Sequence, residues 1–192
     1  MKRLKYLGIF VFVVVGLMLF SGVVSANGCG CDDCCDVHSP GYWKNHPDEW
    51  PVETITIGGQ SFTQSEAIEI MKLPVKGDKR LTLFKALVSA NLNVMHNGGA
   101  DCCLEPCPDC GGCHDSIFVS EIIAYADEWF GVNHIGPITN GRPDGPAVRA
   151  NTDPWQDCCG DVPSCSGDCG GEYLYDILDR YNNEGYCLPI PD

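Results

Sequence analysis

Basic residues are scarce in this chain. It holds 12 Lys and Arg against 26 Asp and Glu, and its formal net charge is −14 with histidine neutral. Such an acidic balance repels the phosphates of nucleic acids and of anionic lipids. We therefore expect no nucleic-acid partner and no attachment to an anionic membrane surface. The charge suits a soluble extracytoplasmic protein with a solvated acidic surface, and the collection of cations is the alternative.

Sequence patterns of the common enzyme classes are also missing. There is no GxSxG nucleophile elbow, no HExxH zinc motif and no P-loop. Carboxylates are plentiful, but their spacing does not single out a catalytic pair. A thiol protease is disfavoured because every cysteine lies where a disulfide is expected. The sequence thus favours a protein without catalytic activity.

The N-terminal segment has the pattern of a secretory signal peptide. A positive n-region precedes an uninterrupted apolar run from Leu7 to Phe20, and Val24-Ser25-Ala26 supplies the small residues of a cleavage site. We expect cleavage after Ala26, and a secreted or cell-surface location. The alternative is an uncleaved membrane anchor, because residues 6–24 are almost long enough to span a bilayer. No lipobox precedes Cys29, which argues against a lipoprotein.

Fourteen cysteines dominate the rest of the composition. They form three groups of four, each with an adjacent Cys-Cys pair, and two further single residues. Because the number is even and the chain carries an export signal, we expect up to seven disulfides, whose connectivity the spacing does not select. The candidates are Cys29, Cys31, Cys34, Cys35, Cys102, Cys103, Cys107, Cys110, Cys113, Cys158, Cys159, Cys165, Cys169 and Cys187.

One pair of these cysteines fits a haem attachment sequence. Cys110, Cys113 and His114 make a CxxCH motif, in which the thiols bond to the haem vinyl groups and the histidine ligates the iron. Residues considered for the second axial position are Met95, His96 and His134. A monohaem c-type electron-transfer protein is therefore the first alternative. Its competitor is a chance CxxC spacing in a cysteine-rich chain.

An extracytoplasmic metal-binding protein is the second alternative. Thiolates in CxxC spacing suit zinc or an iron–sulfur cluster, although export disfavours reduced thiols. Aspartates scattered among the cysteines suit calcium, but no EF-hand loop is present, so solvated loop charges are the preferred interpretation and no cofactor is the main expectation. These aspartates are Asp32, Asp33, Asp36, Asp101, Asp109, Asp157, Asp161 and Asp168.

Hydrophobic periodicity predicts a mainly α fold, a small disulfide-rich bundle of about four short helices with a minor β-hairpin and long irregular loops. A Gly58-Gly59 turn favours the hairpin, and Thr63 with Glu66 forms a capping box. Residues 131–157 lack periodicity and are expected to be irregular. The first helix is predicted after Thr63 and before Pro74, and the second from Thr82 to His96, where Asn97-Gly98-Gly99 ends it. The third is predicted from Ser116 to Phe130 after an Asp115 cap, with an apolar face of Phe118, Ile122, Tyr125 and Trp129. The fourth is predicted around Leu174–Tyr181.

The densest stretch without cysteine is SPGYWKNHPDEWP, from Ser39 to Pro51. Its prolines predict an irregular segment or a single helical turn. Aromatic residues of a small domain usually supply the core, so we expect Trp43 and Trp50 to be buried and His46 to bond to the backbone. The alternative is an aromatic pocket for a sugar or a peptide. The motif residues are Tyr42, Trp43, Lys44, Asn45, His46 and Trp50.

Several segments together carry a resemblance. GYWKNHPDEWP, ITIGG, LPVKGDKRLTLFKALVSANLNV and LYDILDRYNNEGYCLP follow one another between Ser39 and Pro189. In this order the chain resembles the GYWKNHP-type extracellular domain of secreted and surface-attached microbial proteins, a family of unassigned function. The resemblance implies a Cys113–Cys187 disulfide, whereas the three cysteine groups depart from the family pattern.

These features combine into one expectation. After a signal peptide (1–26) and a Cys-rich loop (27–38), residues 39–192 form a single helical, disulfide-stapled domain. We expect a structural or interaction protein with an extracellular or cell-surface partner.

Overall fold

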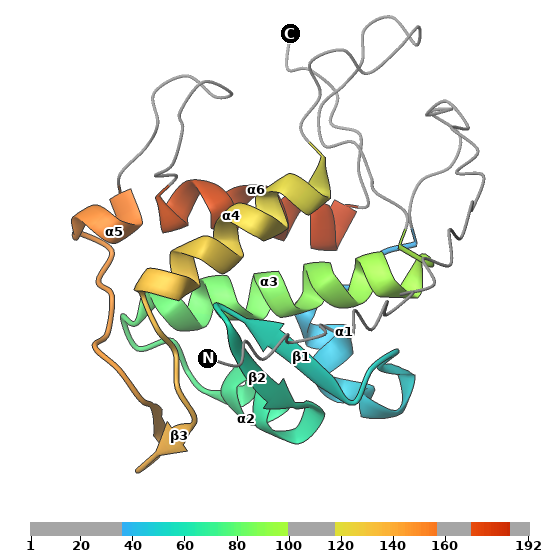
Figure 1. Ribbon diagram of the computed structural model, residues 1–192, viewed down its shortest axis with the longest axis horizontal. Coiled ribbons are helices and arrows are strands. Elements are labelled where there is room, and N and C mark those ends of the chain that lie inside the picture. The colour runs from blue at the N-terminus through green and yellow to red at the C-terminus, as the bar shows by residue number, and fades with distance from the viewer. Residues whose placement is uncertain (1–35, 100–117, 157–169, 185–192) are drawn as a thin grey trace, which may run out of the picture.

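The computed structural model describes residues 36–99, 118–156 and 170–184. This part of the chain is mainly helical, with a small antiparallel hairpin, as the sequence predicts (Figure 1). It contains six α-helices rather than about four, because two short helices form where no long apolar period exists. The helices are α1 (Pro40–Asn45), α2 (Gln64–Lys72), α3 (Lys79–His96), α4 (Val119–Val132), α5 (Asp153–Gln156) and α6 (Gly171–Glu184).

Helix α3 is the centre of the fold. In Figure 1 it lies between α4 and α6 on one side and α1, α2 and the hairpin on the other, and it packs against all four of these helices. Its buried positions are therefore distributed around most of its circumference, from Leu81 and Phe84 to Leu87, Ala90 and Leu92. A helix that is apolar on nearly every side belongs in the interior.

The hairpin and α2 follow from short-range signals. Strands β1 (Thr54–Ile57) and β2 (Gln60–Thr63) pair antiparallel, and Gly58 and Gly59 make the predicted turn with φ of +57° and +76°. The predicted capping box is confirmed, since the Glu66 N–H donates to the Thr63 side chain and Glu66 accepts from the Thr63 N–H. These bonds start α2, which ends before Pro74 as expected.

Two helices begin elsewhere than predicted. α3 starts at Lys79 rather than Thr82, because the Asp78 carboxylate accepts from the Arg80 N–H and caps the first turn. α4 starts at Val119 rather than Ser116, because Phe118 is extended (φ −91°, ψ 151°). Tyr125, expected on the apolar face of α4, is 40% exposed. The expected cap Asp115 lies outside the described residues.

The segment expected to be irregular, residues 131–157, contains local order. Strands β3 (Ile138–Thr139) and β4 (Arg142–Pro143) form a second hairpin, and Asn140 and Gly141 turn between them with φ of +54° and +74°. Both positive φ values are those that a two-residue hairpin turn of the Asn-Gly type requires. α5 follows with its Trp155 buried.

The motif segment is also more regular than predicted. α1 spans Pro40–Asn45, and its N-terminal Ser39 side chain accepts from the Tyr42 N–H. His46 interrupts the helix before Pro47, and one 3₁₀ turn, η1 (Pro47–Glu49), follows. A proline disfavours the helical region for the residue before it, which explains the break.

Candidate metal site

The motif aromatics lie in the interior. Trp43 is fully buried and Trp50 is 8% exposed, and the Trp50 indole N–H donates to the Trp43 carbonyl at 2.8 Å. His46 Nδ1 lies 2.9 Å from the Tyr42 carbonyl, so its ring bonds to the backbone. Lys44 is half-buried and Asn45 is exposed. Trp43 and Trp50 therefore belong to the core, as the sequence predicts.

Every cysteine lies outside the described residues, as does His114, so the disulfide and haem expectations stay predictions. Of the eight aspartates considered for calcium, the described part of the chain contains Asp36. Of the three residues considered as second haem ligands, Met95 and His96 lie at the end of α3, and His134 lies near its beginning, where its carbonyl accepts from Arg80.

Asp36, His38 and His96 come together at the carboxyl end of α3. Each offers one ligand atom, and the three atoms lie within 4.8 Å of one another. The His96 Nε2 atom is 3.8 Å from Asp36 Oδ2, and these side chains are 37% and 74% exposed. Among the described residues, this is the one group with the composition and spacing of a metal site. No sequence pattern singles out His38 as a ligand, and His96 is predicted only as a second haem ligand.

Asn93 of α3 and Asn97, the residue directly after the helix, hold the ligand-bearing segment in place. Asn97 accepts from the Asp36 N–H at 3.1 Å and donates to the Asp36 carbonyl at 2.8 Å. Asn93 makes the same pair of bonds with His38, at 2.8 and 3.0 Å. Four helical residues advance about 6 Å, and two extended residues advance about 6.6 Å. The asparagine spacing therefore matches the Asp36–His38 spacing, and both ligands are directed to one side, toward His96.

An aromatic stack supports His38. Its ring lies on Tyr42 with centroids 3.9 Å apart, and Tyr42 in turn stacks on His46 at 4.2 Å. The Tyr42 hydroxyl donates to Glu49, and this hydrogen bond is the main cause that raises the pKa of Tyr42 to about 12. The phenol therefore stays neutral over the physiological range and packs against the imidazole without adding charge.

The arrangement suits a borderline transition metal. A tetrahedral zinc site has metal–ligand bonds of about 2.0 Å, so its ligand atoms are about 3.3 Å apart. The His96 and Asp36 atoms are 3.8 Å apart and all three atoms lie within 4.8 Å, so the ligands would have to approach one another by up to about 1.5 Å to hold zinc. Two imidazoles and one carboxylate select zinc, copper, nickel or iron, whereas calcium prefers an all-oxygen shell. The carboxyl end of a helix also attracts cations.

Within the described residues, no helix combines the length and the apolar character needed to cross a membrane. Comparison of the chain with protein-family models, with curated proteins and with solved structures gave no match.

Proposed function

We propose that this protein binds a divalent transition metal outside the cytoplasm through Asp36, His38 and His96. The observation that supports the proposal is the convergence of three ligand atoms within 4.8 Å from segments that are 60 positions apart in sequence. Metal affinity depends on pH, because a metal ligand must be deprotonated before it can bind the ion.

The exposure of the site favours reversible capture of the metal. Structural zinc sites are closed by four protein ligands, whereas three protein ligands leave a position for water or for a ligand from a partner. Asp36 and His96 are both open to solvent, so the ion can enter and leave without unfolding. The acidic surroundings, in a chain of net charge −14, raise the local concentration of cations.

Zinc binding by the mature chain tests the proposal. We expect equilibrium dialysis at neutral pH to show one zinc ion fewer on the His38→Ala and His96→Ala variants than on the wild type. His134→Ala is the matched control, because this exposed histidine lies near the opposite end of α3. Asn97→Ala keeps all three ligands but loses the bonds to Asp36, so zinc should bind roughly tenfold more weakly.

Equal zinc binding by wild type, His38→Ala and His96→Ala would refute the proposal, and so would a wild type that binds no zinc. Substitution with Co²⁺ identifies the ligands independently. Nitrogen and oxygen ligands give weak d–d bands, whereas an intense sulfur-to-metal charge-transfer band, retained in the histidine variants, would assign the metal to cysteines and overturn this site.

The cysteines support a separate proposal, that the mature chain is a secreted or cell-surface protein whose 14 cysteines pair as disulfides. In this proposal the fold is rich in disulfides, and the protein has a structural or interaction role without catalysis. Mass spectrometry without reduction should find a chain starting at Asn27, with no free thiol and no added haem mass. A Soret band, or a mass increase of one haem, would instead establish the CxxCH alternative at Cys110, Cys113 and His114.

A further inference from the structure

A second candidate site lies at the opposite end of α3. A cleft of about 290 Å³ opens between the α2–α3 connection and the segment that follows β3. The two sites are separated by the length of the helix, since 16 residues of α helix from Arg80 to His96 span about 24 Å. A ligand in this cleft would therefore not contact the metal site.

The charge of the cleft is opposite to that of the chain. Its lining contains four cations, Lys76, Arg80, Arg142 and Arg149, and one carboxylate, Asp78. These are four of the nine basic residues beyond the predicted signal peptide, gathered on one surface of a protein whose net charge is −14. A cleft lined by one sign of charge concentrates ligands of the other sign.

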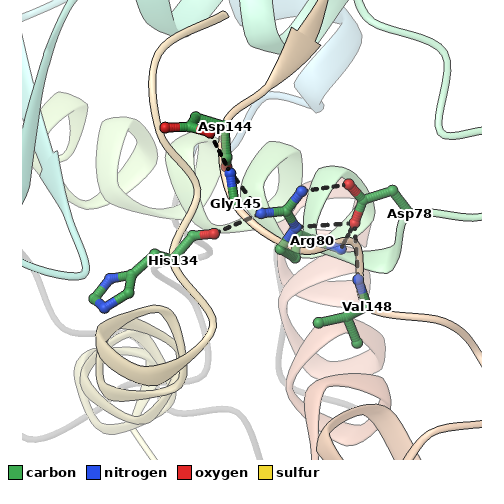
Figure 2. Close-up of polar contacts among 6 residues, drawn as sticks. All are labelled: Asp78, Arg80, His134, Asp144, Gly145 and Val148. Atoms are coloured by element: carbon green, nitrogen blue, oxygen red, sulfur yellow. Dashed lines mark hydrogen bonds and ion pairs between the residues drawn. The ribbon is translucent and has the colours of Figure 1, made fainter. Parts of the chain in front are cut away.

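Arg80 has a structural role in the cleft. It is 1% exposed and binds the Asp78 carboxylate through Nε and Nη2, at 3.1 and 2.7 Å. Its Nη1 donates to the carbonyls of His134 and Asp144, at 2.6 and 3.0 Å. Figure 2 shows the guanidinium between these groups, reaching from α3 to the loop that contains Gly145. Arg80 and Asp78 therefore neutralise each other and fasten the two walls together.

Further bonds make the cleft rigid before any ligand arrives. The Lys79 N–H donates to the Val148 carbonyl at 2.8 Å, and the Val148 N–H donates to Asp78 at 3.3 Å (Figure 2). At Gly145, a Cβ atom would lie 2.8 Å from Arg80 Nη1, so the loop approaches the guanidinium as closely as glycine allows. A preformed site avoids the entropic cost of ordering its walls on binding.

Three cations remain available to a ligand. Lys76, Arg142 and Arg149 are exposed, and within the described part of the chain none of them pairs with a carboxylate. The Arg149 side chain lies beside the turn, since its Nη1 is 3.3 Å from the position that a Cβ on Gly77 would occupy. Lys76 adopts φ of +43°, a left-handed conformation that is uncommon for residues other than glycine and that often marks a functional position.

We propose that this cleft binds a small organic oxyanion that carries at least two negative charges, such as a polycarboxylate or a sulfated or phosphorylated small molecule. Arginine forks bind carboxylate, sulfate and phosphate oxygens in pairs, and three unpaired cations balance two or three charges. Leu73, Val75 and Pro143 add apolar lining for the carbon skeleton. The volume of about 290 Å³ restricts the ligand to a small molecule.

Calorimetric titration of the mature chain with citrate, inorganic sulfate and glucose 6-phosphate tests the proposal. We expect saturable binding of citrate or glucose 6-phosphate, and affinity should fall about tenfold or more in Arg149→Ala and in Arg142→Ala, since each loses a charge-assisted bond. Arg180→Ala is the matched control, an exposed arginine on α6. The same three variants should bind zinc like the wild type, which separates this result from that of the metal site.

Several results would overturn the proposal. One is the absence of binding for all three anions. A second is an equal loss of affinity in Arg180→Ala and Arg149→Ala, which would indicate nonspecific attraction. A third is binding of long polyanions alone. Sulfate binding with the affinity of citrate and glucose 6-phosphate would also contradict it, because the apolar lining would then contribute nothing to recognition.

Discussion

Replacement of Asn93 by alanine should destabilise the protein strongly. Asn93 is fully buried, and its amide makes four hydrogen bonds. Its oxygen accepts from the His38 N–H and the Trp43 indole at 2.8 and 2.9 Å, and its nitrogen donates to the His38 carbonyl and to Asn182 Oδ1 at 3.0 and 2.9 Å. Every donor and acceptor of the side chain is therefore used.

The magnitude follows from the groups left without partners. The backbone of His38 is partly exposed and can bond to water. The Trp43 indole and the Asn182 oxygen belong to residues that are 0% and 1% exposed, so they lose their partner without replacement. Each unsatisfied buried group costs about 1–3 kcal/mol, which gives roughly 2–6 kcal/mol for Asn93→Ala. That is a large part of the roughly 5–15 kcal/mol that stabilises a typical domain.

Urea denaturation without a reducing agent measures this loss as a lower midpoint at unchanged slope. Asn91→Ala is the matched control, because Asn91 lies on the same helix and, within the described residues, its amide donates to the Leu87 carbonyl of the preceding turn. We expect its midpoint to stay near that of the wild type. A loss below about 1 kcal/mol in Asn93→Ala, or equal losses in both variants, would refute the assigned role of the amide.

Two further predictions concern the hairpin turn and the aromatic stack. Gly58→Ala should lower the free energy of unfolding by roughly 2–5 kcal/mol, since at φ of +57° a Cβ would lie 2.6 Å from the Phe130 carbonyl carbon. Gly59→Ala should lower it by only about 1–2 kcal/mol, because a Cβ on Gly59 would point into open space. Equal urea midpoints for the two variants would contradict this. Glu49→Gln should lower the Tyr42 pKa from about 12 toward its ordinary 10.0. Because the raised pKa keeps the folded phenol protonated, the stability of the wild type should fall between pH 10 and 12. This fall should be smaller in Glu49→Gln. An ultraviolet titration of tyrosinate that is the same in both proteins would count against the Tyr42–Glu49 bond.

Features that the sequence predicted well depend on a few adjacent residues. The Thr63–Glu66 capping box and the Gly58-Gly59 turn need only each other, so local rules suffice. The start of α3 is predicted three residues too late, because the charged Arg80 is typical of a polar turn. In the fold Arg80 is buried and bonds to carbonyls more than 50 positions away. The second hairpin was missed although Asn140-Gly141 is a strong turn signal, because its strands are too short to show alternation.

The candidate sites were harder to predict for the same reason. Asp36 and His38 lie on one side of an extended segment, but only packing on α3 brings them to His96. The one sequence signal that could have indicated this is the pair Asn93 and Asn97, whose four-residue spacing matches two residues of extended chain. The basic cleft likewise gathers Lys76, Arg142 and Arg149 from segments that are over 60 positions apart.

The long-range bonds of Asn93 determine when the proposed metal site can form during folding. Asn93 joins His38, which is 55 positions before it, to Asn182, which is 89 positions after it. The complete set of Asn93 bonds therefore requires the chain from His38 to Asn182. A metal ion that binds the assembled site more tightly than the unfolded chain would stabilise the native state by mass action. With Co²⁺ in place of zinc, the visible absorption of the bound ion would then report the final step of folding.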